Sequence, residues 1–97
     1  MKIPQIIQVV GTPYQIVIDT SLIERKLAGE IDETADRIKL SPTQSDSDKL
    51  CTLIHEVLHA INHKFTCALS EEQIEGIDDG LVQFILQLVP GSEIDWS

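Results

Sequence analysis

Short runs of β-branched side chains dominate the first part of the chain. Residues 5–10 (QIIQVV) and 14–18 (YQIVI) both have this character, and Gly11-Thr12-Pro13 between them favours a turn. The pattern predicts two strands joined by a tight turn. The next segment, residues 20–28, suits either a short helix or the approach to a further strand.

Charged and apolar side chains alternate in residues 37–40 (RIKL), as is typical of a half-exposed strand. Arg37 and Lys39 share one face of this strand, and cationic side chains of this kind commonly protect the edge of a sheet. We therefore expect residues 37–40 to form an edge strand. Gly29 and the acidic cluster of Glu30, Asp32, Glu33 and Asp36 are expected to form a loop.

A helical repeat begins after residue 41. Ser41 is suited to cap a helix, with Pro42 in the first helical position and Gln44 completing a capping box, and Ser45 is a competing cap. Apolar side chains then recur at the three- and four-residue spacing of one helical face. This spacing predicts a long helix whose apolar face carries Leu50, Ile54, Val57, Leu58, Ile61 and Phe65.

A second helix is predicted from about Ser70, a good N-cap that is followed by Glu71 and Glu72 in the first turn. Pro90-Gly91 ends it. Its predicted apolar face carries Ile74, Ile77, Leu81, Phe84, Ile85 and Leu88. The chain is therefore predicted to be a single α+β domain, residues 1–97, with a small N-terminal β-sheet followed by two helices.

The composition narrows the range of functions. A content of 42% hydrophobic and 24% charged residues is that of a globular protein, and the net charge of −9 argues against binding to nucleic acid. The chain has neither an apolar run of about 20 residues nor the features of a signal peptide. Cys51 and Cys67 do not form a disulfide framework, so a cytoplasmic protein without a membrane partner is expected.

The stretch LIHEVLHAIN in the first predicted helix contains His55 and His59, four residues apart, with Glu56 between them. On a helix this spacing projects two imidazoles from one face, while Glu56 points to the side, where it can reach a water molecule. The alternative is an amphipathic helix with two surface histidines. His63 and Cys51 continue the spacing, but each lies one turn, about 5.4 Å, along the axis, which is too far for the same ion.

The motif HEVLHA, followed after fifteen residues by Glu75-Gly76-Ile77-Asp78-Asp79, resembles the gluzincin class of metallopeptidases. The plan of the chain resembles the smallest members, the minigluzincins, and related phage-encoded ImmA/IrrE-like proteins. The resemblance implies an active-site helix and a glutamate helix, with Zn²⁺ held by His55, His59 and Glu75 and a supporting role for Asp79. The small Gly76 and Gly80 would let the two helices approach closely.

Helical-wheel angle alone does not decide between Glu75 and Glu71 as the third ligand. We expect Glu75, because the first-turn carboxylates of Glu71 and Glu72 are already explained by the helix dipole and because Asp79 follows Glu75 by one turn.

The implied activity is that of a zinc-dependent metalloendopeptidase, with Glu56 as general base toward a zinc-bound water and a protein or peptide as substrate. Residues 37–40 would pair with an extended substrate. The sequence shows no clear oxyanion-stabilising residue, since its one tyrosine, Tyr14, lies far upstream. The alternative is therefore a zinc-binding interaction module with little or no activity. Trp96 in the tail either covers the cleft or packs on the sheet, and the sequence defines no oligomeric state.

Overall fold

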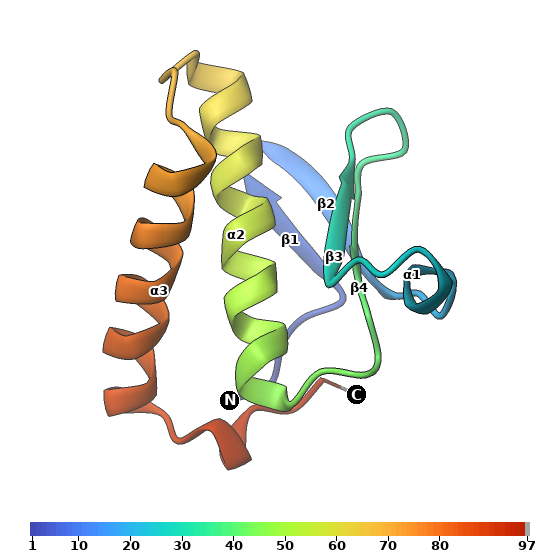
Figure 1. Cartoon of the computed structure of the whole chain (residues 1–97), viewed down its shortest axis with the longest axis vertical. Coiled ribbons are helices and arrows are strands. Elements are labelled where there is room, and N and C mark those ends of the chain that lie inside the picture. The colour runs from blue at the N-terminus through green and yellow to red at the C-terminus, as the bar shows by residue number, and fades with distance from the viewer. Residues whose placement is uncertain (97) are drawn as a thin grey trace.

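The computed structural model describes residues 1–96 and has the α+β architecture that the sequence predicts (Figure 1). A four-stranded sheet is followed by two long helices. The elements in chain order are β1 (Ile6–Val9), β2 (Thr12–Ile18), α1 (Ser21–Glu24), β3 (Gly29–Asp32), β4 (Arg37–Leu40), α2 (Asp46–Phe65), α3 (Glu71–Leu88) and the 3-10 turn η1 (Gly91–Glu93).

The strands lie in the order β1-β2-β4-β3. The β1–β2 and β3–β4 pairs are antiparallel and the β2–β4 pair is parallel. The prediction of an edge strand at residues 37–40 is therefore wrong, because Ile38 of β4 pairs with Ile16 on one side and with Ile31 on the other. Burial of Ile38 and Leu40 explains the central position of β4.

The edge strands are β1 and β3, and β3 occupies part of the acidic stretch that was predicted to be a loop. Glu30 stays half-exposed and forms ion pairs with Arg25 and Lys39. A strand with one unpaired side tolerates such charged residues, because they reach solvent beside the sheet.

Helix α2 packs on the sheet and begins later than the first capping signal suggests. The Oγ atom of Ser45 accepts a hydrogen bond from the backbone N–H of Asp48 at 3.1 Å, so Ser45 is the N-cap. The side-chain amide of Gln44 instead donates to the carbonyl of Ala28 at 3.0 Å, which ties the segment before α2 to the start of β3. The core between α2 and the sheet contains Tyr14, Ile38, Leu40, Leu53 and Ala60.

Helix α3 lies against the side of α2 that faces away from β3 and β4 (Figure 1). It turns toward α2 a face that includes Ile74, Asp78 and Val82, which are its buried residues. The predicted apolar face was therefore wrong for Ile77, Leu81, Phe84 and Leu88, which are exposed.

The two glycines of α3 do not lie at the helix contact that they were expected to permit. Cβ atoms built on Gly76 and Gly80 would meet nothing within 4 Å. Both positions are exposed, so close approach of α2 and α3 does not depend on them.

The last residues of the described chain return to its beginning. Lys2 and Asp95 form a parallel bridge, and Ile94 is buried. Trp96 packs against the apolar cluster between α2 and the sheet and does not line the cavity beside Glu56, so of the two expected positions it takes the one against the sheet. No helix within residues 1–96 has both the length and the apolar character of a membrane span.

Candidate metal centre

His55 and His59 project from one face of α2, as their four-residue spacing predicts. Their ring centroids are 4.8 Å apart, and their Nε2 atoms approach to 3.2 Å. Both residues are partly buried, with side chains 19% and 33% exposed. The two nitrogens therefore point to one location at the margin of the packed core.

The carboxylate of Glu71, the first residue of α3, completes this group. Its Oε1 atom is 2.7 Å from Nε2 of His55, and its Oε2 atom is 3.0 Å from Nε2 of His59. The donor atoms of His55, His59 and Glu71 all lie within 4.8 Å of one another. The side chain of Glu71 is 55% exposed, so the group is open to solvent on this side.

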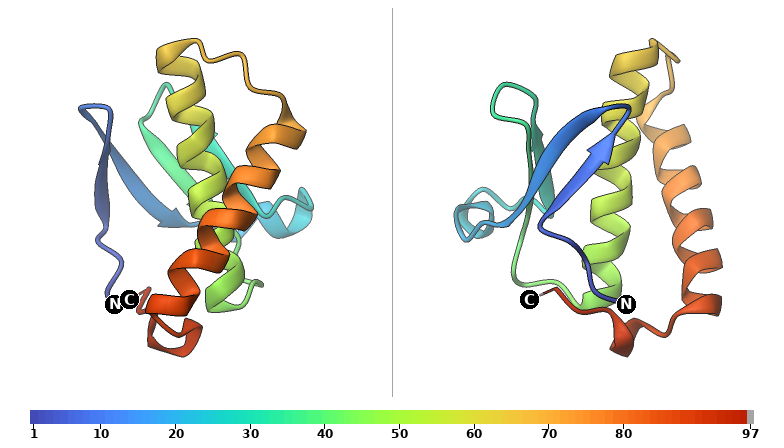
Figure 2. Two further views of the ribbon diagram at one scale, coloured as in Figure 1. Left: turned by 90° about the vertical axis from the view of Figure 1, so that its left-hand side faces the viewer. Right: turned by 180° about the vertical axis from the view of Figure 1, so that it is seen from behind.

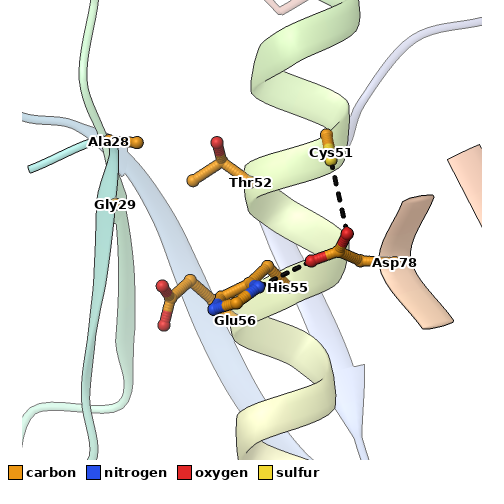
Figure 3. Close-up of a pocket in the computed structure, with 7 residues that line it drawn as sticks. All are labelled: Ala28, Gly29, Cys51, Thr52, His55, Glu56 and Asp78. Carbon is orange, nitrogen blue, oxygen red and sulfur yellow. Dashed lines mark hydrogen bonds and ion pairs between the residues drawn. The ribbon is translucent and has the colours of Figure 1, made fainter. Parts of the chain in front are cut away.

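Asp78 fixes the orientation of the His55 ring from the opposite side. Its Oδ2 atom lies 2.6 Å from Nδ1 of His55, as Figure 3 shows, and the residue is 3% exposed. Because a carboxylate accepts hydrogen bonds, Nδ1 donates its proton to Asp78, and Nε2 is the ring nitrogen that faces Glu71 and His59.

The same contacts determine the pKa of His55. Burial alone would lower it, but the hydrogen bond to Asp78 and the negative charges of Glu71 and Glu56 outweigh burial, so the pKa lies above the ordinary histidine value. A site that stabilises positive charge on His55 also favours a cation bound beside it.

Glu56 follows His55 on α2, and its side chain points toward β3 (Figure 3). It is buried, 8% exposed, and burial raises the pKa of its carboxyl above the ordinary value in spite of the two neighbouring histidines. Within residues 1–96 the carboxylate has no hydrogen-bond partner. A raised pKa and a free carboxylate are properties of a general base that takes a proton from water.

A cavity of about 250 Å³ lies beside Glu56 and His55. Its lining comes from the start of β3, from α2 and from α3 (Figure 3). The lining residues are Ala28, Gly29, Cys51, Thr52, His55, Glu56 and Asp78. The cavity thus connects the candidate base with the edge strand.

The group of His55, His59 and Glu71 fits zinc in chemistry and in size. Two imidazoles and one carboxylate are a donor set of catalytic zinc sites, in which donor atoms of a tetrahedron lie about 3.4 Å apart. The two histidine nitrogens are 3.2 Å apart, and the carboxylate oxygens are 2.7 and 3.0 Å from them. These separations are close to the spacing that a tetrahedral zinc site requires.

The structure brings Glu71 to the histidines, whereas it leaves Glu75 exposed and outside this group. The cause is the antiparallel packing of α2 and α3. Glu71 and Asp78 are seven residues, almost two turns, apart, so both lie on the face of α3 that contacts α2. Glu75 lies about 40° around the helix from Glu71, at the border of this face. The assignment of Glu75 stays a prediction, but the geometry favours Glu71.

Asp79 also differs from its predicted place. It lies 3.6 Å from Sγ of Cys51 and is exposed, whereas Asp78 holds His55. Sequence reasoning passed over Asp78 because the family pattern points to the fourth residue after Glu75. The seven-residue spacing of Glu71 and Asp78 could have indicated that both lie on one face of the helix.

Cys51 and His63, the other two candidates on α2, do not join the histidine pair. Cys51 lies one turn before His55 and contacts Asp78 and Asp79 at 3.6 Å. Burial, together with these carboxylates, raises the pKa of its thiol to about 12. His63 is exposed and belongs to neither of the groups of candidate metal-binding side chains found in residues 1–96.

No family model matches this sequence, and no curated protein or solved structure shows a significant similarity to it. Support for a function therefore comes from the site itself.

Proposed function

We propose that the protein is a zinc-dependent peptidase whose metal is held by His55, His59 and Glu71. The observation that carries the proposal is the arrangement around His55-Glu56. The histidine nitrogens converge on Glu71 on one side, while Glu56 faces a cavity beside an edge strand on the other. The H-E-x-x-H motif supplies two ligands from one helix face and a glutamate beside them as base, and Glu56 would reach a zinc-bound water from the cavity that it shares with His55.

Zinc, when bound, would polarise the carbonyl of a substrate and lower the pKa of a water molecule. Glu56 would accept the proton of that water and pass it to the leaving amine. Burial of Glu56 favours this role, because the raised pKa allows the carboxyl group to hold the proton between the two steps.

The substrate would bind as an extended peptide along β3. Within residues 1–96, β3 pairs only with β4, so its other side offers free backbone groups. Gly29 of β3 lines the same cavity as Glu56, which places a peptide paired with β3 within reach of the base. The predicted peptide-binding strand, residues 37–40, cannot take this role because β4 is paired with β2 on one side and with β3 on the other.

One observation favours a second candidate, a zinc-bound module that recognises a peptide without cleaving it. The cavity lining contains no tyrosine, lysine or arginine that would stabilise an oxyanion. Tyr14 is buried, and its hydroxyl donates to Oε2 of Glu33 at 2.7 Å. Asp79 has no part in either candidate. The free thiols of Cys51 and Cys67 favour a cytoplasmic location for both.

The test combines metal analysis with a cleavage assay on a mixed peptide library. The wild type is expected to bind one zinc per chain and to cleave peptides. Glu56→Gln is expected to keep the zinc and lose at least about 100-fold in rate, since an amide cannot accept the proton. Glu72→Gln, an exposed carboxylate of α3, is the matched control and should behave as the wild type.

The outcomes separate the candidates. Zinc binding without cleavage by the wild type would favour the module that only binds peptides. Cleavage by Glu56→Gln at the wild-type rate would remove Glu56 as the base. A zinc content near zero after supplementation would remove both candidates.

A further inference from the structure

Helix α3 carries an exposed apolar row beside the face that packs against α2. Ile77, Leu81, Phe84 and Leu88 are 38%, 43%, 58% and 68% exposed. In Figure 2 (left), α3 lies in front of α2, and no other element covers its outer side. Single exposed apolar residues are ordinary, but a continuous row of four on one helix is typical of an interaction surface. We call these four residues the outer row.

The outer row is also free of charge, in a chain whose net charge is −9. The acidic residues of α3 point about 90° or more away from the centre of the outer row on a helical wheel. They are Glu71, Glu72, Glu75, Asp78 and Asp79, all in the N-terminal half of the helix. From Gly80 to Gly91 the sequence GLVQFILQLVPG has no charged residue. An apolar partner can therefore approach the outer row without meeting a carboxylate.

The spacing of the outer row indicates what this partner is. The intervals between Ile77, Leu81, Phe84 and Leu88 are four, three and four residues, which is the repeat of a helix that packs along another helix. The row is symmetric, because Ile77 and Leu88 lie equally far from the midpoint between Leu81 and Phe84. A two-fold axis through this midpoint would set Ile77 against Leu88 and Leu81 against Phe84 of an identical helix.

We propose that the outer row is a self-association surface on which α3 pairs, antiparallel, with α3 of a second copy of this chain. The direction follows from the charges. A parallel pair would place the acidic halves of the two helices at the same level, where they would repel one another. In the antiparallel pair, the acidic half of each helix lies beside the uncharged half of the other.

The size of the surface sets the strength of the dimer. The two helices overlap along residues 77–88, a length of about 18 Å. A standard stable interface buries about 800 Å² on each partner, which is more than one short helix row supplies. The dimer is therefore reversible and depends on protein concentration. None of the outer-row residues lines the cavity at Glu56 or belongs to the group of His55, His59 and Glu71, so association is independent of zinc and of peptide cleavage.

Sedimentation equilibrium over a range of protein concentrations, with a reductant and a chelator present, tests the proposal. The wild type is expected to form dimers at high concentration. Leu81→Glu should raise the dissociation constant at least about 10-fold, because it places a charge in the row. Ile6→Glu is the control, since Ile6 is 60% exposed on β1, at the opposite end of the sheet from β3, and should not change the constant. Circular dichroism verifies that each variant is folded.

A mixture of two variants tests the direction. Leu81→Glu and Phe84→Lys should each associate poorly alone, but an equimolar mixture should associate at least about 10-fold more tightly than either, since the antiparallel pairing sets the two new charges side by side. A wild type that stays monomeric up to about 1 mM would overturn self-association. A mixture no tighter than its parts would overturn the antiparallel pairing. Loss of dimer in Ile6→Glu but not in Leu81→Glu would move the interface to β1.

Discussion

The Oδ2 atom of Asp78 lies 2.6 Å from the Nδ1 atom of His55 and connects the buried face of α3 to the histidine motif of α2. This contact holds the ring so that Nε2 points to Glu71 and His59. A histidine that ligates a metal is usually held by such a partner on its other ring nitrogen. Asp78, and not Asp79, is therefore the residue that orients the candidate ligand His55.

We expect Asp78→Asn to weaken zinc affinity about 10–100-fold, because the neutral amide supports the His55 ring less well than the carboxylate. Asp79→Asn, one residue on and exposed, should change the affinity less than about 3-fold. Competition titration with a chromophoric chelator measures both values. An equal loss in the two variants would show that only the total charge near the site matters.

Glu71→Ala should abolish tight zinc binding, whereas Glu75→Ala should leave it nearly unchanged, because only the carboxylate of Glu71 lies beside both histidines. The same titration applies. Since Glu75 lies one turn further along α3, the comparison also tests the assignment that the family resemblance implies. The largest loss at Glu75 would restore that assignment and would mean that its side chain turns toward the histidines when the metal binds.

Gly29→Ala should destabilise the protein by about 1–3 kcal/mol, the usual cost of overpacking a filled site. A Cβ atom at this position would collide with Cγ2 of Thr52 and lie 3.1 Å from the carbonyl oxygen of Lys39. Gly80→Ala is the matched control. Its Cβ atom meets nothing within 4 Å, so this change in a helix should stabilise by about 0.5–1 kcal/mol. Urea denaturation of both variants measures the difference, and equal stability would contradict the close approach of β3 to α2.

Tyr14 should make the protein sensitive to alkali. Burial, then the hydrogen bond to Glu33, raises its pKa from 10.0 to about 12. A raised pKa in the folded state means that the stabilisation is fully present below pH about 10 and is lost as the pH rises through about 12. The free energy of unfolding of the wild type should therefore fall through this range.

The matched variant is Tyr14→Phe, which removes the hydroxyl. It should be less stable at neutral pH by about 1 kcal/mol, the net value of one hydrogen bond, but its stability should fall less steeply between pH 10 and 12. Urea denaturation at a series of pH values measures both curves. Parallel curves would show that other groups cause the alkaline loss.

The sequence predicted the α+β class, both long helices and the Ser70 cap, because these depend on local patterns. Helical spacing and capping residues act within a few residues of one another. The identity of the edge strand could not be predicted in this way. It depends on which strand β4 pairs with, and the parallel β2–β4 contact joins segments more than 20 residues apart.

The outward face of α3 was mispredicted for a related reason. Periodicity identifies an apolar row, but it does not tell whether that row or the polar one beside it faces the neighbouring helix. Here the contact with α2 takes the face that includes Glu71 and Asp78, and Leu81 and Phe84 are left outside. The convergence of His55 and His59 was predicted, since it needs only the geometry of one helix. The third ligand had to be chosen among five acidic residues of α3, and that choice depends on how α2 and α3 pack together.

The three candidate ligands and Asp78 all belong to one helical hairpin, in which the longest separation, from His55 to Asp78, is 23 residues. Closing such a short loop costs little chain entropy, and contacts of low order form early in folding. The surroundings of Glu56 are different, because Gly29 and the edge of β3 lie outside this hairpin and take their place only as part of the four-stranded sheet. Under the proposed function, the hairpin alone would bring the metal ligands together, whereas the edge that receives the peptide would exist only once β3 has paired with β4.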